Sequence, residues 1–232
     1  KSPGEFRTIQ NMIGKIQGGK SEIIYRPSPP EQVQELTRDL EAFFQAGHDI
    51  SPLIQCAMIH YQFEAIHPFL DGNGRIGRLI LPLILCEKKI FSNPLLYLSA
   101  YFEKHQQEYY NGLLAVSQKS EWREWIEFFL VAFTEQAEET IRNIQEQQKV
   151  HKKYETTLKE KKTGTKTVFL LEHLIANPYI TIPNAQEILK TSYPTAKNAI
   201  MSLVEAGILT EIAVIRGKKV FFAEEMDKIL EC

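Results

Sequence analysis

Twelve residues, His67 to Arg78 (HPFLDGNGRIGR), combine a histidine, an acid, three glycines and two arginines. Gly72 and Gly74 allow the backbone to turn sharply and to approach an anion closely. Backbone N–H groups at such a turn, reinforced by the positive end of a following helix, form a binding site for anions. Arg75 lies three residues before Arg78, so both guanidinium groups share one face of that helix and can bind phosphate oxygens. The stretch therefore predicts a polyphosphate site.

Two residues of the stretch suit catalysis as well as binding. Pro68 disfavours helical backbone at His67, so the imidazole should lie at the mouth of the preceding helix, where it can act as a general base. Asp71 supplies the hard oxygen ligand that Mg²⁺ prefers beside a polyphosphate. Taken singly, His67 is more often a structural histidine and Asp71 a turn or cap residue. Their order and spacing within one stretch favour a catalytic site.

The same stretch contains G-x-G-x-x-G at Gly72, Gly74 and Gly77, a pattern typical of dinucleotide-binding folds. That fold requires a strand before the glycines and a βαβ unit around them. Apolar residues at helical spacing instead predict one helix from Pro52 to about Ile66 and a second from Asn73 to about Lys89. The context therefore excludes the dinucleotide fold.

Helical patterns dominate the rest of residues 1–150. Apolar residues from Val33 to Phe43 recur at helical spacing and predict a helix that stops at Gly47. Residues 2–14 resemble a short capped helix, and residues 18–30 an exposed extended segment between turn formers. Further helices are expected after Leu98. We expect residues 1–150 to form one helical domain.

The remainder of the chain follows a different pattern. Residues 151–165 are polar and lysine-rich, which is typical of a linker. Three short helical segments then precede two strand-like runs, TEIAVIR and KKVFFA, that flank Gly217. Three helices followed by a hairpin is the order of a winged helix-turn-helix domain. We expect residues 166–232 to form such an α+β domain.

The chain has 232 residues, of which 27 are basic and 29 acidic, and its net charge of −2 disfavours a general nucleic-acid binder. Its apolar runs are too short for a transmembrane helix, and its first residues do not resemble a secretory signal. Cys56, Cys86 and Cys232 are far apart in the sequence, which favours a reducing compartment. We expect a cytoplasmic protein without a membrane partner.

Residues 67–78 resemble the Fic family motif H-x-F-x-[DE]-G-N-G-R-x-x-R at every fixed position. The likeness extends from PGEFR through PLLYLSAYFEKHQQEYY to FFLVAFTEQAE, and the last part of the chain is similar to the winged helix of many bacterial Fic proteins. The resemblance implies a mainly α fold, in which a Fic helical domain with a β-hairpin flap at about residues 20–26 precedes the winged helix. It also implies transfer of AMP from ATP to a Ser, Thr or Tyr hydroxyl of a target protein, with release of pyrophosphate.

The resemblance also implies the role of each residue in the motif. His67 would deprotonate the attacking hydroxyl, and Asp71 would hold Mg²⁺ on the phosphates of ATP. Gly72, Asn73 and Gly74 would form the anion hole. Arg78 would pair with the γ-phosphate. The expected ATP site comprises Gly72, Asn73, Gly74, Arg75, Ile76, Gly77, Arg78, Tyr109 and Tyr110, with the two tyrosines near the base.

The flap would bind a segment of the target protein by strand addition, through Ser21, Glu22, Ile23, Ile24 and Tyr25. Self-modification and homodimer formation stay open at this point. From Glu160 onward the chain carries nine basic and nine acidic residues, which favours protein docking or dimerisation over DNA binding for the winged helix.

Two alternatives stay open from the sequence. The donor could be UTP, GTP or CDP-choline, because a phosphate cradle does not read the base, and Ser117 stands where some relatives have an adenosine-contacting asparagine. The chain could also be a nucleotide-sensing winged-helix transcriptional regulator. Many Fic proteins carry an inhibitory helix, [ST]-x-x-x-E-[GN], whose glutamate pairs with the second motif arginine, here Arg78. No segment matches this pattern fully, so we expect the helix to lie upstream or on a partner protein.

Overall fold

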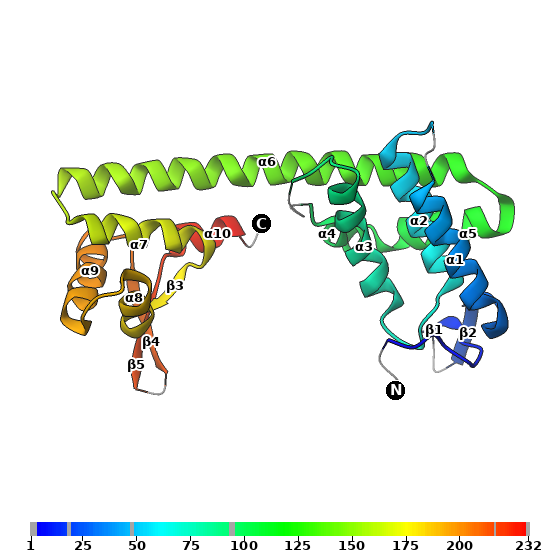
Figure 1. Cartoon of the computed structure of the whole chain (residues 1–232), viewed down its shortest axis with the longest axis horizontal. Coiled ribbons are helices and arrows are strands. Elements are labelled where there is room, and N and C mark those ends of the chain that lie inside the picture. Colours follow the sequence, from blue (N-terminus) through cyan, green and yellow to red (C-terminus); the bar gives the residue numbers. More distant parts are fainter. Residues whose placement is uncertain (1–3, 18–19, 47–48, 93–95, 216, 231–232) are drawn as a thin grey trace. The chain divides into compact units, whose positions relative to one another are not determined.

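The computed structural model describes residues 4–17, 20–46, 49–92, 96–215 and 217–230. The chain divides into two compact units, Lys1–Glu138 and Glu139–Cys232 (Figure 1). Helices dominate both units, and each contains one small antiparallel sheet, which confirms the predicted mainly α fold class. In the described part of the chain, no helix is both long and apolar enough to cross a lipid bilayer.

The first unit is built around α2 (Pro52–Ile66), which contacts α1, α3 and α5. Buried residues occur on every side of α2, and the indole Nε1 of Trp125 donates a hydrogen bond of 2.9 Å to the carbonyl of Ala57. The other elements of the unit are β1 (Ile13–Gln17), β2 (Lys20–Tyr25), a 3₁₀ turn (Pro30–Gln32), α1 (Val33–Gln45), α3 (Asn73–Glu87), α4 (Leu98–Lys104), α5 (Gln106–Lys119) and the first part of α6 (Trp122–Glu160).

The helix boundaries on either side of the glycine-rich stretch agree with the sequence-based prediction. Pro52 occupies the first helical position of α2, where its missing N–H leaves no hydrogen bond unmade. α2 ends at Ile66, and α3 begins at Asn73 after Gly72, whose φ of 85° suits a residue without a side chain. The stretch from His67 to Gly72 is therefore a tight connection between two packed helices.

The predicted helix over residues 2–14 is wrong, because the described residues before Ile13 are not helical. Arg7, which is 2% exposed, donates instead to backbone carbonyls that are distant in sequence. Its Nε donates to His67 O at 2.9 Å, and its other nitrogens donate to the carbonyls of Ile66, Ser28 and Ile9. These tertiary hydrogen bonds hold this segment against the end of α2, in place of a local helix.

The second unit contains the rest of α6, then α7 (Thr165–Ala176), β3 (Tyr179–Thr181), α8 (Ile182–Leu189), α9 (Tyr193–Glu205), β4 (Thr210–Ile215), β5 (Lys218–Phe222) and α10 (Glu224–Leu230). The sheet order is β3-β5-β4, and all pairs are antiparallel. The three predicted helices and the hairpin are present in the predicted order. The sequence did not predict β3 or α10.

The predicted linker over residues 151–165 is wrong for its first ten residues, because α6 continues to Glu160. Tyr154 and Leu158 are buried in the core of the second unit, with Val150 packed against them. These apolar residues recur every four positions, so they form one face of a helix whose other faces carry the lysines and glutamates. Lys161 to Gly164 alone separate α6 from α7.

We predict that Arg7→Met will destabilise the first unit by about 3 kcal/mol, because several buried carbonyls lose a charged donor while the side-chain volume is nearly kept. The measurement is urea unfolding followed by tryptophan fluorescence. Both tryptophans, Trp122 and Trp125, lie in the first unit and report on it selectively. The exposed Arg38 on α1 provides the matched control, Arg38→Met. Equal unfolding midpoints for the two variants would contradict the anchoring role of Arg7.

Candidate active site

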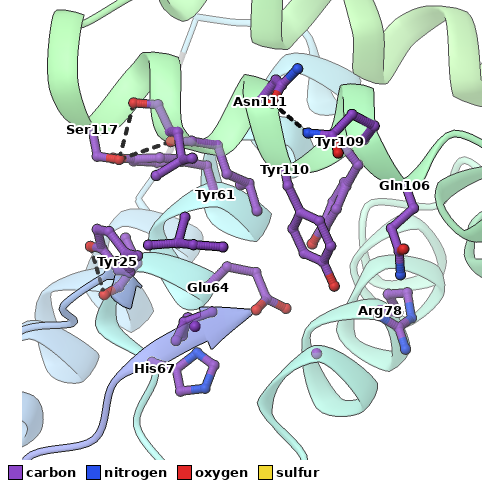
Figure 2. Close-up of a pocket in the computed structure, with 18 residues that line it drawn as sticks. Tyr25, Tyr61, Glu64, His67, Arg78, Gln106, Tyr109, Tyr110, Asn111 and Ser117 are labelled. Carbon is purple, nitrogen blue, oxygen red and sulfur yellow. Dashed lines mark hydrogen bonds between the residues drawn. The ribbon is translucent and has the colours of Figure 1, made fainter. Parts of the chain in front are cut away.

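A cavity of about 440 Å³ opens in the first unit between the β1–β2 hairpin, the end of α2, the first turns of α3, and α5 (Figure 2). Seven of the predicted site residues line it: His67, Gly74, Arg78, Tyr109 and Tyr110, together with Ile24 and Tyr25 of the predicted flap. The motif, the tyrosine pair and the flap are far apart in sequence. The fold brings them to one cavity.

His67 is held in a left-handed backbone conformation, with φ 52° and ψ 60°, at the end of α2. Its N–H donates to Phe63 O at 3.0 Å, and its carbonyl accepts the hydrogen bond from Arg7. Such a conformation is costly for a residue other than glycine and persists only where surrounding contacts enforce it. The imidazole points into the cavity (Figure 2), and its Nδ1 is buried without a hydrogen-bonding partner among the described residues.

Burial lowers the pKa of the His67 imidazole from its ordinary value; the nearby backbone carbonyl of Glu64 opposes this shift, and the positive charge of Arg7 adds to it. The ring is therefore neutral at pH 7. A neutral imidazole can accept a proton, as a general base must.

α3 begins after Gly72, an N-cap residue that has no side chain with which to cap the helix. The first intrahelical hydrogen bond runs from Ile76 N to Gly72 O at 3.0 Å, so the amides of Asn73, Gly74 and Arg75 have no acceptor within the helix. The Asn73 side chain is buried and spans the turn, because its Oδ1 accepts from Phe69 N at 2.8 Å and its Nδ2 donates to Phe69 O at 2.7 Å. Asn73 thus shapes the loop with its side chain and offers only its backbone N–H to an anion.

The two motif arginines differ in position. Arg78 lines the cavity, and its guanidinium lies over Gly74, 3.2 Å from the point where a Cβ on that glycine would be. Arg75 is largely exposed and lies 3.9 Å from Asp71 in a surface ion pair. It lines a neighbouring hollow that also contains Arg78. Ile76 and Gly77, predicted as part of the ATP site, do not line the cavity.

Asp71 is exposed at the start of the turn, and the described residues contain no cluster of three or more His, Cys, Asp or Glu side chains that could hold a metal ion by themselves. A single carboxylate next to an anion site nevertheless fits Mg²⁺. This ion commonly uses one or two carboxylates and takes its remaining ligands from phosphates and water.

The two tyrosines, Tyr109 and Tyr110, differ in burial and in their contacts. Tyr109 is 5% exposed, and its hydroxyl lies 2.9 Å from Nε2 of the buried His60, whose Nδ1 lies 3.2 Å from Gly77 O. A carbonyl can only accept, so Nδ1 carries the proton of the neutral ring and the Tyr109 hydroxyl donates to Nε2. Burial lowers the pKa of His60 to about 4, which keeps the ring neutral. Tyr110 is 40% exposed and is the more accessible of the two on the cavity wall.

The predicted flap is the β1–β2 hairpin. Ile23 is 50% exposed, whereas Ile24 and Tyr25 line the cavity and the Tyr25 hydroxyl donates to Ala65 O at 3.1 Å. The side chains of Ser21 and Glu22 lie outside the described residues. The strand pairing joins β1 and β2 only to each other among the described elements, so each keeps one open edge.

Glu64 lines the cavity and was missed from the sequence. It lies in the last turn of α2, three residues before His67, and both side chains line the cavity. Its position as an acidic residue in the last turn of the helix before the motif is the signal that could have drawn attention to it. Burial raises the pKa of its carboxyl to about 7, although the charge of Arg78 opposes the shift.

Comparison with known proteins finds similar sequences and a similar fold. Residues 1–85 match the family model described as the Fic/DOC family. Over 84 residues the chain is 34% identical to a protein adenylyltransferase of Caenorhabditis elegans, covering 35% of this chain and 15% of that protein. Over 86 residues it is 36% identical to a probable protein adenylyltransferase of Aquifex aeolicus, covering 35% of this chain and 27% of that protein. The chain thus spans roughly a quarter or less of the length of these relatives.

Among solved structures, a Fic family protein from Desulfovibrio desulfuricans G20 superposes with a TM-score of 0.54 and 22% identity, covering 96% of this chain and 63% of that one. This likeness concerns the fold. The family match lies on the hairpin, α1, α2 and most of α3, the elements that hold His67 and the glycine-rich turn after it. Residues 1–85 of the chain are therefore similar to the Fic/DOC family.

Proposed function

We propose that this chain is a protein adenylyltransferase that transfers AMP from ATP to a Ser, Thr or Tyr hydroxyl of a target protein. One observation carries the proposal: the neutral imidazole of His67, the first turn of α3 at Gly74 and the guanidinium of Arg78 meet at one cavity. In the proposed reaction the hydroxyl oxygen bonds to the α-phosphorus, the bond to the β-phosphate oxygen breaks, and pyrophosphate leaves. His67 takes the proton of the attacking hydroxyl.

The chain's own residues would bind and orient the phosphates. The amides at the start of α3 and the positive end of that helix would stabilise the negative charge, and Arg78 would bind the terminal phosphate. Asp71 would hold Mg²⁺, which when bound neutralises charge on the phosphates. The open edge of the β1–β2 hairpin would take up a target segment by strand addition.

The nucleoside would occupy the part of the cavity between the hairpin and α5, where Tyr110, Leu113 and Ser117 line the wall. The Ser117 hydroxyl already donates to Leu113 O at 2.9 Å, and Gln107 donates to Asn111 at 2.9 Å. Side chains that are already hydrogen-bonded within the protein discriminate weakly between the bases of different nucleotides. UTP, GTP and CDP-choline therefore stay as alternative donors.

For residues 166–232 we propose protein docking or dimerisation rather than DNA binding. The exposed strand β4 carries Ile212, Val214 and Ile215, each at least 50% exposed, where a DNA-binding wing would need basic groups. A cytoplasmic location remains part of the proposal. Burial raises the pKa of the Cys56 thiol to about 12, which suits a structural cysteine.

The function is tested by incubating the protein and a cell extract with ATP labelled at either the α- or the γ-phosphate. Label retained on protein only from the α position is the expected result. Retention of label only from the γ position would indicate a kinase. Retention from neither position would favour the alternative that the chain is a nucleotide-sensing transcriptional regulator.

We predict that His67→Ala will reduce transfer by about 10²–10⁴-fold, the usual contribution of a positioned general base. ATP affinity should stay close to that of the wild type, because the imidazole acts on the attacking hydroxyl. Transfer is measured from α-labelled ATP, and affinity by calorimetry. Wild-type transfer by the variant would remove His67 from the mechanism.

We predict that Asp71→Ala will lose both transfer and the Mg²⁺ dependence of ATP binding, whereas Asp71→Glu, which keeps a carboxylate, should retain part of each. The measurement is ATP affinity as a function of Mg²⁺ concentration. An unchanged Mg²⁺ titration in the alanine variant would leave Asp71 with only its role in the turn.

A further inference from the structure

Glu64 places a carboxyl group directly against the first turns of α3. A Cβ added to Gly77 would collide with its Oε1, so the glycine leaves the space that this carboxyl occupies. Oε1 is buried, and none of the described residues donates a hydrogen bond to it. Figure 2 shows the Glu64 side chain inside the cavity, on the same side as His67. A buried acceptor without a donor is costly unless the group is protonated or a ligand compensates it.

The charge of the Arg78 guanidinium acts on the Glu64 carboxyl. A Cβ added to Gly74 would lie 3.2 Å from Nη1 of Arg78 and 3.9 Å from Oε1 of Glu64. The two side chains therefore share the space over the anion-binding turn. A phosphate bound to Arg78 at this turn would bring a second negative charge close to the Glu64 carboxyl.

We propose that Glu64 competes with the phosphates of the nucleotide for Arg78 and takes up a proton when the nucleotide binds. The inference rests on the proposed function, since it requires a nucleotide phosphate at Arg78. Two negative groups in one poorly solvated site cannot both stay ionised cheaply. Protonation of Glu64 removes the repulsion, and it leaves the guanidinium to the phosphate.

Several other titratable or charged groups face this carboxyl. They are His60 and Tyr61 of α2, His67 directly after α2, Arg78 of α3, Tyr109 and Tyr110 of α5, and Tyr25 of β2. Burial lowers the pKa of both histidines and raises that of Tyr25, Tyr61 and Tyr109, in each case away from neutral pH. The carboxyl of Glu64, with a pKa of about 7, is the group placed to exchange a proton near neutrality.

The direction of the pH effect follows from the two protonation states. Below pH 7 the carboxyl of the free protein is already protonated, so binding needs no further proton. Above pH 7 the free carboxyl is ionised, and binding must take up a proton until the higher pKa of the complex is reached. Affinity for the nucleotide therefore falls as pH rises above 7, by at most about tenfold per pH unit for one proton.

The test compares the wild type with Glu64→Gln, which keeps the shape of the side chain and cannot ionise. The dissociation constant of ATP is measured at saturating Mg²⁺ at pH 6.5, 7.5 and 8.5. The titration of ATP itself is common to all forms and cancels in the comparison. We expect the wild-type affinity to fall by about tenfold relative to Glu64→Gln across this range. Glu103→Gln provides the matched control, because Glu103 is an exposed carboxylate on α4 facing the hollow that also contains Arg78.

Calorimetry of the wild type in two buffers of different ionisation enthalpy gives a second measurement that needs no variant. The expected result is uptake of a fraction of a proton on ATP binding at pH 7.5. Parallel pH dependence in wild type and Glu64→Gln, or binding without proton uptake, would overturn the role of Glu64 and leave the proposed function intact. Failure of every form to bind ATP at any pH would contradict the proposed function itself.

Discussion

The hydrogen bonds of Arg7 to backbone carbonyls are the constraint on which the site depends. The connection between α2 and α3 turns so sharply that the carbonyls of Ile66 and His67 leave the helix without helical partners. A buried guanidinium supplies the donors, at 3.2 Å and 2.9 Å, respectively. It presents five donors in a fixed planar arrangement, so it satisfies several carbonyls from one position. The left-handed backbone of His67 is thereby enforced by a residue 60 positions earlier in the chain.

A second constraint is the close approach of α2 and α3, which glycine makes possible. A side chain on Gly77 would meet both Phe63 and Glu64 of α2. Because this position stays empty, the two helices pack closely enough for His60 to reach Gly77 O and for Glu64 to lie beside the first turn of α3. The glycine therefore serves packing and site chemistry together, although its backbone is ordinary helix.

Burial, more than direct ion pairing, determines the protonation states in the cavity. Desolvation keeps both His60 and His67 neutral. A neutral ring suits His60 for its structural hydrogen bonds and suits His67 for accepting a proton. Desolvation moves the pKa of Glu64 in the opposite direction, towards neutral pH. The same low-polarity surroundings thus lower the pKa of two imidazoles and raise the pKa of a carboxyl within eight residues of the chain.

The sequence by itself determined the local features. Pro52, Pro68 and Gly72 set the ends of α2 and α3, because their backbone restrictions act within a few residues. The twelve-residue motif therefore predicted the turn between these helices and named the candidate base. Contacts between distant segments were decided only by the tertiary structure. These include the anchoring of His67 by Arg7, the difference in exposure between Tyr109 and Tyr110, and the burial that turns Glu64 into a titratable group of the site. The linker prediction for residues 151–160 was wrong for the same reason. Tyr154 and Leu158 belong to a helix that packs against a hydrophobic core, and the local lysine-rich sequence does not show that this core will be there.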